Sequence, residues 1–301
     1  MFQNTIPKMK HPPGIPLCAK RRAIIMKEIS LADGTVFPLF VFPLLEQCGA
    51  VKHGFTTRFG GVSEGIFSTL NFSFSRGDRR EAVEENYRRL AEALSVDYGS
   101  FVLSDQTHTT NVIRVRKEDA GNGIVFGQKY QDVDGMVTNE KEVTLITFHA
   151  DCVPLYFADP VHHAIGLSHS GWRGTAGRIG KVTLDKMHRE FGTRPSDVFC
   201  AIGPSICRNC YEVGEDVAEK FREEFSETKE ILIDKGNGKY LLDLWKANEI
   251  VLLEAGVPSG HLAVTQICTC CHPEVLFSHR ASRGKRGNLA AVMALGDERR
   301  F

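Results

Sequence analysis

The pattern of short apolar runs is the feature that most constrains how this chain can fold. Runs of five to eight residues that are bounded by turn residues are typical of buried β-strands rather than helices. Five such runs occur in the first two thirds of the chain: Val51–Arg58, Asn111–Val115, Val143–Phe148, Val153–Phe157 and Ala164–Ser168. They predict a core built mainly from β-sheet.

Helical spacing of apolar residues predicts helices around these strands. Four ranges show it: Glu81–Leu94, Thr175–Phe191, Asp216–Phe225 and Leu244–Ala255. Gly192 and Gly256 follow two of the ranges and supply stop signals. Because strands and helices do not alternate in a regular βαβ rhythm, we expect an α+β fold, a layered domain of mixed β-sheets flanked by helices.

The domain organisation is predicted to be simple. No internal repeat and no long linker after residue 40 is visible in the 301 residues, so residues 26–301 are expected to form a single domain. Residues 1–25 combine basic residues with several prolines and are expected to be a poorly ordered tail. Whether the native start is Met1 or Met26 stays open.

Charge and cysteine content limit the partners and the compartment. Lys plus Arg and Asp plus Glu are both 37, so no general attraction to nucleic acid or to an anionic membrane is expected, and the substrate should be a small molecule. The longest apolar run, Phe37–Leu45, is too short to span a bilayer. Nine cysteines, an odd number in a long chain for which we expect no export signal, favour a reducing, cytoplasmic compartment. A monomer and a homodimer are both compatible with the sequence.

Three segments place reactive side chains at the ends of predicted strands. They are 105–108, 149–154 and 168–174, and they contain His108, Cys152 and His169. Two imidazoles and a thiolate suit zinc, which in catalytic sites uses three protein ligands and keeps one position open. Spacings of 44 and 17 residues do not make a local metal motif. Ordinary core or surface roles for these residues therefore remain an alternative.

Other chemistries are also open at this stage. Cys152 could be the nucleophile of a Cys–His hydrolase, with His169 or His108 as its base. A binding module without catalysis is a further alternative. Glycine-rich dinucleotide and phosphate-loop motifs are absent from the sequence, which argues against nucleotide-cofactor enzymes of those types.

Two further pairs of cysteines have the C-x-x-C form of a zinc ribbon, Cys207 with Cys210 and Cys268 with Cys271. The two pairs are much farther apart than the 15–20 residues usual in that motif. We therefore expect buried thiols, and a second metal site stays an alternative. The adjacent pair His162 and His163 is expected to lie in a surface turn.

Several ordered motifs resemble the YfiH/laccase-domain family. The motifs run from about residue 50 to the C-terminus and comprise 53–63, 134–138, 150–154, 169–174, 202–204, 211–214 and 278–280. Members of that family have been called polyphenol oxidases, purine nucleoside phosphorylases and peptidoglycan editing factors. The resemblance implies an α+β layered fold with mixed sheets.

The resemblance also implies a function. It implies a zinc site formed by His108, Cys152 and His169, phosphorolysis of adenosine, inosine, guanosine and methylthioadenosine, and adenosine deamination. Purine nucleoside and phosphate would then be the bound molecules. A copper-dependent oxidase and a peptidoglycan-editing hydrolase that acts on a cell-wall precursor are the alternatives within the family.

Phosphorolysis requires groups that hold phosphate, and planar guanidinium groups are well suited to this. Arginines in or near glycine-containing loops are the candidates, because backbone amides there can also approach an anion. The predicted substrate residues are Arg58, Gly60, Gly61, Arg173, His279 and Arg280. A structural ion pair is the alternative role for each arginine. Asp151 is expected either to carry a proton or to orient a histidine ligand.

Overall fold

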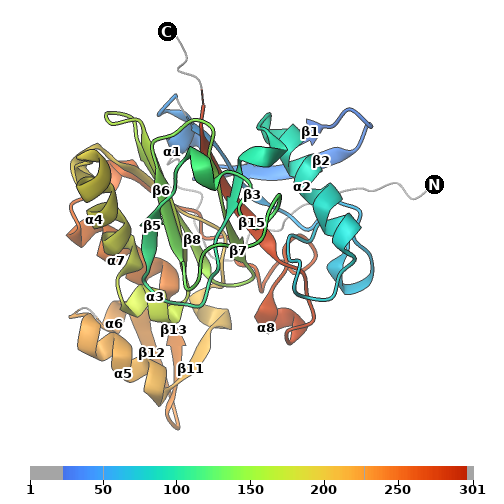
Figure 1. Ribbon diagram of the computed structural model, residues 1–301. Helices are drawn as coiled ribbons and strands as arrows, with labels where there is room; N and C mark the ends of the chain where they lie inside the picture. The colour runs from blue at the N-terminus through green and yellow to red at the C-terminus, as the bar shows by residue number, and fades with distance from the viewer. Residues whose placement is uncertain (1–22, 50, 227, 297–301) are drawn as a thin grey trace.

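Two six-stranded mixed sheets form the centre of the computed structural model, which describes residues 23–49, 51–226 and 228–296 (Figure 1). The first sheet consists, in spatial order, of β1 (Ile25–Ser30), β2 (Val36–Val41), β3 (Val51–Thr56), β15 (Leu289–Leu295), β7 (Thr144–His149) and β4 (Phe101–Leu103). The second consists of β14 (Leu262–Val264), β10 (Phe199–Ile202), β8 (Val153–Asp159), β9 (Ala164–Ser170), β6 (Gly135–Thr138) and β5 (Val112–Arg114).

Both sheets mix parallel and antiparallel pairs. In the first sheet β15 lies between β3 and β7 and is antiparallel to both, whereas β4 is parallel to β7. In the second sheet β8 and β9 form an antiparallel hairpin, and the edge strands β5 and β14 are parallel to their neighbours. The α+β class with mixed sheets is therefore confirmed, and each of the five predicted strand ranges overlaps an observed strand.

Side chains alternate between the two faces of each strand, and this divides the core into three layers. On β2, Phe40 packs between the two sheets, whereas Phe37 and Leu39 face the opposite way. On β8, Tyr156 packs between the sheets and Leu155 faces outward. Successive side chains of a strand point to opposite faces, so each sheet buries both of its faces and needs helices outside.

Helices cover the two outer faces. α2 (Arg80–Leu94) packs on the first sheet through Val83, Tyr87 and Leu90, and α4 (Ile179–Phe191) and α7 (Leu244–Glu254) pack on the second. Figure 1 shows α2 on one side of the molecule and α4 with α7 on the other. The remaining α-helices are α1 (Pro43–Glu46), α3 (Trp172–Ala176), α5 (Glu215–Glu224), α6 (Thr228–Ile231) and α8 (His279–Ser282). No helix within the described ranges is both long and apolar enough to cross a membrane.

The predicted helix 175–191 is in fact two helices. α3 ends at Ala176, and α4 begins at Ile179 after Arg178, which adopts a left-handed conformation with φ of 57°. A left-handed residue breaks the helical hydrogen-bond series. Gly192 ends α4 with φ of 79°, as predicted from its position.

A small subdomain follows β10 in the sequence. It contains the three-stranded sheet β11 (Glu212–Gly214), β13 (Lys239–Leu242) and β12 (Leu232–Gly236), together with α5 and α6. Figure 1 shows it projecting from one end of the molecule. This segment lies in the sequence between β10 and β14, which are nevertheless paired neighbours.

The predicted tail boundary needs a correction of three residues. Ile25 begins β1, and Ala23 and Ile24 pack against the core between the sheets. These residues belong to the folded part because their apolar side chains cover the edge of that core. The rest of the predicted tail, residues 1–22, lies outside the described residues.

Candidate active site

His108 lies in the loop that follows β4, in an unusual backbone conformation. Its φ is 67°, in the left-handed region. The loop is held by the carboxylate of Asp134, which accepts hydrogen bonds from the backbone N–H groups of Thr107, His108 and Thr109 at 2.8 to 3.1 Å. The fully buried Asp134 thereby fixes where the imidazole of His108 lies.

Cys152 lies in the tight turn that joins β7 to β8. Asp151, before it, has φ of 104°, and its carbonyl accepts a hydrogen bond from the N–H of Ile206 at 2.9 Å. Nδ1 of His149 lies 3.1 Å from the carbonyl oxygen of Cys152, and Nε2 lies 2.8 Å from Oγ1 of Thr147. Burial holds the pKa of His149 well below its usual value, so this imidazole is neutral and braces the turn.

His169 is supplied by β9, directly opposite Pro154 of β8. Its Nδ1 donates to Oδ1 of Asp134 at 2.8 Å, which leaves Nε2 to face Cys152 and His108. Burial raises the pKa of Asp134, but the hydrogen bonds and positive charge from His169, together with backbone N–H groups, outweigh burial and lower the pKa below its usual value.

The structure brings the three predicted residues together. One nitrogen or sulfur atom from each of His108, Cys152 and His169 lies within 4.8 Å of the other two, and Sγ of Cys152 lies 3.8 Å from Nε2 of His108. Donor atoms about 2.0–2.3 Å from one tetrahedral ion are separated by roughly 3.3–3.8 Å. Small side-chain rotations would therefore bring all three donors onto one cation.

The charge state of the cluster is also suitable for a cation. Burial raises the pKa of Cys152, but the neighbouring histidines outweigh burial and lower it to about 6. Burial lowers the pKa of His169, but Cys152 and Asp134 outweigh burial and raise it to about 9. The pair is thus a thiolate beside an imidazolium, and a bound cation would take the place of the imidazolium proton.

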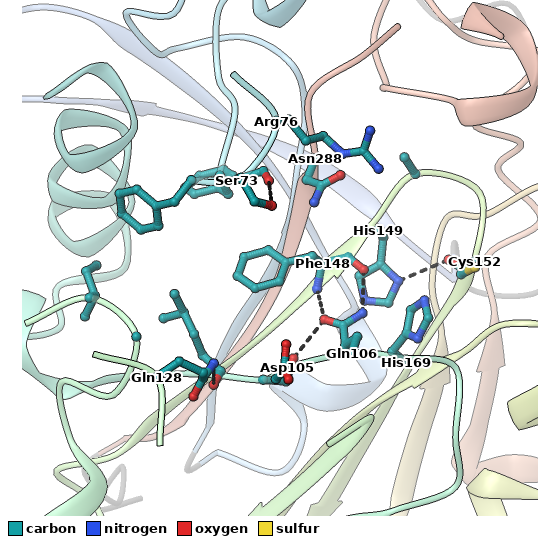
Figure 2. Close-up of a pocket in the computed structure, with 18 of the residues that line it drawn as sticks. Ser73, Arg76, Asp105, Gln106, Gln128, Phe148, His149, Cys152, His169 and Asn288 are labelled. Carbon is teal, nitrogen blue, oxygen red and sulfur yellow. Dashed lines mark hydrogen bonds between the residues drawn. The ribbon is translucent and has the colours of Figure 1, made fainter. Parts of the chain in front are cut away.

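A cavity of about 650 Å³ opens beside this cluster. Figure 2 shows His149, Cys152 and His169 at one side, Asp105 and Gln106 on one wall, and Arg76 and Asn288 on another. Gln106 is a structural group, since its amide hydrogen-bonds both backbone groups of Phe148. The Asp105 carboxylate, by contrast, has no side-chain hydrogen bond to any described residue. The volume is in the range of small-molecule sites.

The predicted substrate residues Arg58, Gly60 and Gly61 are not among the described residues that line this cavity. The guanidinium of Arg58 donates to the carbonyl oxygens of Ser68 and Pro273 and lies 4.7 Å from the ring centre of Phe277. A Cβ atom on Gly61 would lie 2.3 Å from the carbonyl oxygen of Thr69. These residues have structural roles because their loop packs tightly against its neighbours.

Arg173, His279 and Arg280 are likewise not among the described residues that line the cavity. Arg173 is exposed and lies over the ring of Trp172 at 4.2 Å. The guanidinium of Arg280 donates to the carbonyl oxygens of Cys210 and Glu212, both at 3.1 Å.

Asp151 does not orient a histidine ligand. Its carboxylate accepts hydrogen bonds from the Thr269 hydroxyl at 2.6 Å and from the backbone N–H of Arg280 at 2.7 Å. Asp134 has the orienting role instead. The sequence offered one signal for Asp134, its place in the Asp134–Gly135 motif before a strand, but spacing alone could not pair it with His169.

Three arginines that the sequence did not single out line the cavity, Arg76, Arg80 and Arg286, and Arg80 is paired with Glu84. Burial and the nearby Arg76 lower the pKa of Arg286 to about 10. Nη1 of Arg286 donates a hydrogen bond to Oδ1 of Asn288, whereas the buried Nε of Arg286 has no hydrogen-bond partner among the described residues. Two neighbouring cations, one with a buried unpaired donor, favour an anion between them.

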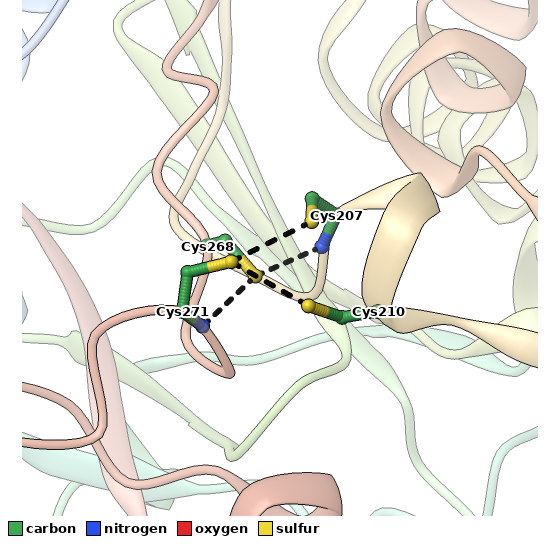
Figure 3. Close-up of side chains that lie close together, drawn as sticks. All are labelled: Cys207, Cys210, Cys268 and Cys271. Atoms are coloured by element: carbon green, nitrogen blue, oxygen red, sulfur yellow. Dashed lines mark hydrogen bonds between the residues drawn. The ribbon is translucent and has the colours of Figure 1, made fainter. Parts of the chain in front are cut away.

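The four cysteines of the two C-x-x-C pairs also converge. Their sulfur atoms lie within 4.8 Å of one another (Figure 3). Only Cys268 is buried, whereas Cys271 is exposed and the other two are half-buried. The expectation of buried thiols is therefore wrong for three of the four.

His162 lies in the turn after β8, as expected, with Nδ1 2.8 Å from Oδ2 of Asp159.

Comparison with known proteins gives a consistent answer. Residues 52–296 match the family described as multi-copper polyphenol oxidoreductase laccase. A protein of Geobacillus stearothermophilus named purine nucleoside phosphorylase YlmD is 40% identical over 252 residues, which cover 83% of this chain and 92% of the relative. A Bacteroides thetaiotaomicron protein named purine nucleoside phosphorylase is 39% identical over 81% of this chain and 92% of its own length.

Solved structures agree with this. The crystal structure of YlmD from Geobacillus stearothermophilus superposes with a TM-score of 0.81 at 37% identity, covering 86% of this chain and 96% of that one. The Bacillus licheniformis hypothetical protein YfiH gives the same TM-score at 33% identity, covering 85% and 96%. This chain therefore belongs to the laccase-domain family that contains the YfiH and YlmD proteins.

Proposed function

We propose that this protein is a zinc-dependent purine nucleoside phosphorylase whose nucleoside and phosphate bind in the cavity beside His108, Cys152 and His169. The observation that carries the proposal is that a candidate metal cluster and two arginines, Arg76 and Arg286, lie on the walls of one cavity. The names of the relatives support it. The substrates would be adenosine, inosine, guanosine and methylthioadenosine, and adenosine deamination would share the site. A reducing, cytoplasmic compartment would keep Cys152 available.

Zinc fits the donor set better than copper. One thiolate and two imidazoles, one of them oriented by a carboxylate, are a donor set that zinc accepts, and the ion when bound would act as a Lewis acid beside the cavity. The described residues offer one His–Cys–His group and one group of four cysteines for metal binding. Neither group supplies the many histidines that a multicopper oxidase requires.

Phosphate would be held by Arg76 and Arg286 in place of the arginines predicted from the sequence. Phosphate oxygens would accept a hydrogen bond from the unpaired Nε of Arg286 and would offset the repulsion between the two guanidinium groups. Charge-assisted hydrogen bonds of this kind contribute about 1.5–3 kcal/mol each. The nucleoside would then lie between this anion site and the metal cluster.

Asp105 is the proposed proton-transfer group. Its carboxylate lines the cavity, and no described residue holds it in a side-chain hydrogen bond. Phosphorolysis places negative charge on the departing purine, so a carboxyl group that exchanges a proton with the base would assist its departure. Asp151 cannot have this role in the described conformation, because both of its carboxylate oxygens are already hydrogen-bonded.

The test compares Arg286→Gln and Arg76→Gln with Arg79→Gln in zinc-loaded protein. Arg79 is a neighbouring exposed arginine that does not line the cavity. We expect the KM for phosphate to rise roughly tenfold or more in the first two variants and to stay unchanged in the control. Adenosine deamination should change less, because it does not use phosphate. Absence of phosphate-dependent base release by the wild-type protein would refute the proposed function.

A Cys–His hydrolase remains the second candidate, since the thiolate–imidazolium pair of Cys152 and His169 is also the arrangement of a cysteine nucleophile. The two candidates assign different roles to the same sulfur atom. A nucleophile needs a free thiolate, whereas a metal ligand is occupied. Zinc content and activity after replacement of Cys152 with Ala therefore separate the two candidates.

A further inference from the structure

The group of four cysteines, Cys207, Cys210, Cys268 and Cys271, lies in two loops brought together by the second sheet. β10 and β14 run parallel, with Cys200 opposite Leu262 and Ile202 opposite Val264. The loops that follow therefore leave the sheet at the same end. A bridge between Ser205 and Cys268 continues the pairing, through hydrogen bonds from Ser205 N–H to the Ile267 carbonyl at 3.0 Å and from Thr269 N–H to the Ser205 carbonyl at 3.1 Å.

We propose that these four cysteines form a second metal site, a structural zinc centre with four thiolate ligands. Sγ of Cys271 lies 3.5 Å from Sγ of Cys210 and 4.0 Å from Sγ of Cys207. Sulfur atoms about 2.3 Å from a tetrahedral zinc ion are separated by roughly 3.8 Å, so the observed separations lie on either side of that value. A sulfur–sulfur bond of about 2.05 Å is much shorter than either.

Two backbone N–H groups are already directed at one of the sulfur atoms. Sγ of Cys268 accepts from the N–H of Cys271 at 3.3 Å and from the N–H of Cys207 at 3.2 Å. Donors of this kind stabilise thiolates, which four-thiolate zinc sites require. Arg280, which donates to the Cys210 carbonyl at 3.1 Å, adds a positive charge beside a centre whose net charge would be negative.

The site is also connected to the turn that carries Cys152. Thr269, between Cys268 and Cys271, donates its hydroxyl to the buried carboxylate of Asp151. Ile206, directly before Cys207, donates its N–H to the carbonyl of Asp151. The zinc centre would therefore hold together the two loops on which the strained Asp151 conformation depends. Its role would be to brace the candidate active site from outside the cavity.

Zinc content measured on full-length protein, purified without chelator, tests the proposal. We expect two zinc ions per wild-type chain, one after Cys271→Ser and one after Cys152→Ala. Cys48→Ser is the control for loss of a half-buried thiol elsewhere, and Cys270→Ser tests whether the neighbouring cysteine is a ligand. Both should retain two ions. Two independent losses of one ion separate this site from the proposed catalytic one, so that either site can fail alone.

Measurements on the wild-type protein keep the test decisive if a variant does not fold. X-ray absorption at the zinc edge should give a mean of about 2.5 sulfur ligands per zinc, whereas occupancy of the His–Cys–His group alone would give about one. All nine cysteines should react with a thiol reagent after denaturation in chelator without reductant. A single zinc that disappears in Cys152→Ala, or a count of seven or fewer thiols, would overturn the proposal.

Discussion

Asp134 holds both histidines of the candidate metal cluster, since its Oδ1 lies 2.8 Å from Nδ1 of His169 and 3.1 Å from the backbone nitrogen of His108. One fully buried carboxylate thus orients an imidazole on β9 and shapes the loop after β4. Because the hydrogen bond fixes which ring nitrogen of His169 carries the proton, Nε2 is the atom left for a metal ion.

Replacing Asp134 with Asn should weaken metal binding without removing a metal ligand. Loss of a partner that orients a ligating histidine typically lowers metal affinity by about 10–100-fold. A competition titration with a zinc indicator would measure the change. Asp132→Asn is the matched control, because Asp132 accepts a hydrogen bond from the Thr107 hydroxyl at the surface of the same loop. Equal affinities for the two variants would contradict the role given to Asp134.

Glycine is the only residue type that fits at position 171, where the chain leaves β9. A Cβ atom there would lie 2.7 Å from Cδ2 of His108 and 3.2 Å from Sγ of Cys152. We expect Gly171→Ala to displace both side chains and to lower zinc occupancy and activity at least tenfold, with little change in secondary structure. Gly127→Ala is the control, because Gly127 lines the same cavity but has open space around it. Unchanged zinc affinity in Gly171→Ala would show that the cluster tolerates the added methyl group.

The strands and helices that could be predicted were those in which apolar residues recur at a regular spacing or turn residues mark both ends. β8 and β9 were visible as short apolar runs, whereas β15 was not. Its sequence, Leu289–Leu295, is rich in Ala, Leu and Met, which favour helices. β15 is buried on both faces at the centre of the first sheet, so it shows no alternation of polar and apolar residues.

The candidate site was predictable in part for a similar physical reason. The side chains of His108, Cys152 and His169 belong to residue types that commonly bind metal ions or act in catalysis, and each residue lies near the end of a strand. The role of Arg286 could not be predicted, because it depends on a buried Nε atom that has no hydrogen-bond partner among the described residues of the folded chain. The four-cysteine group was underestimated because its loops are 61 residues apart and only the parallel pairing of β10 with β14 joins them.

His53 should make the protein less stable in mild acid. Burial lowers the pKa of His53 to about 4, and its Nε2 accepts the backbone N–H of Phe42 at 2.9 Å. The unfolded chain, with a histidine pKa of about 6.5, binds the proton first as pH falls. Stability is therefore fully present above about pH 6.5 and is lost towards pH 4, by about 2 kcal/mol at pH 5.

Urea unfolding of the wild-type protein and of His53→Gln from pH 7.5 to 5 would measure this contribution. The Gln carboxamide oxygen can accept the Phe42 N–H but does not titrate. The difference in unfolding free energy between the two proteins should shrink by about 2 kcal/mol across this range. Parallel curves would mean that His53 is not the group responsible.

Asp105→Asn should separate proton transfer from binding. If the carboxyl exchanges a proton with the purine, kcat should fall by about 10²–10⁴-fold, whereas zinc content and the KM for phosphate should stay near their wild-type values. A fall in zinc content together with kcat would instead mean that Asp105 supports the metal cluster.

Cys152 decides between a metal enzyme and a Cys–His hydrolase. If Cys152 is a metal ligand, its replacement with Ala or Ser removes one of the three bonds between the protein and the metal ion. A serine hydroxyl does not restore this bond, because it is rarely ionised near neutral pH and binds zinc weakly. Zinc should fall by one ion per chain relative to the wild-type protein, activity should fall with it, and excess zinc should restore part of the activity of Cys152→Ser.

If Cys152 is instead the nucleophile, the same replacements should abolish turnover while the metal content stays unchanged, and excess zinc should have no effect. Cys48→Ser controls for the loss of a thiol, since burial raises the pKa of Cys48 to about 12 and keeps that thiol protonated. Zinc per chain and base release, measured on the same samples, therefore give opposite patterns for the two roles. Undiminished zinc in an inactive Cys152→Ala protein would mean that the sulfur atom attacks the substrate and does not hold the metal.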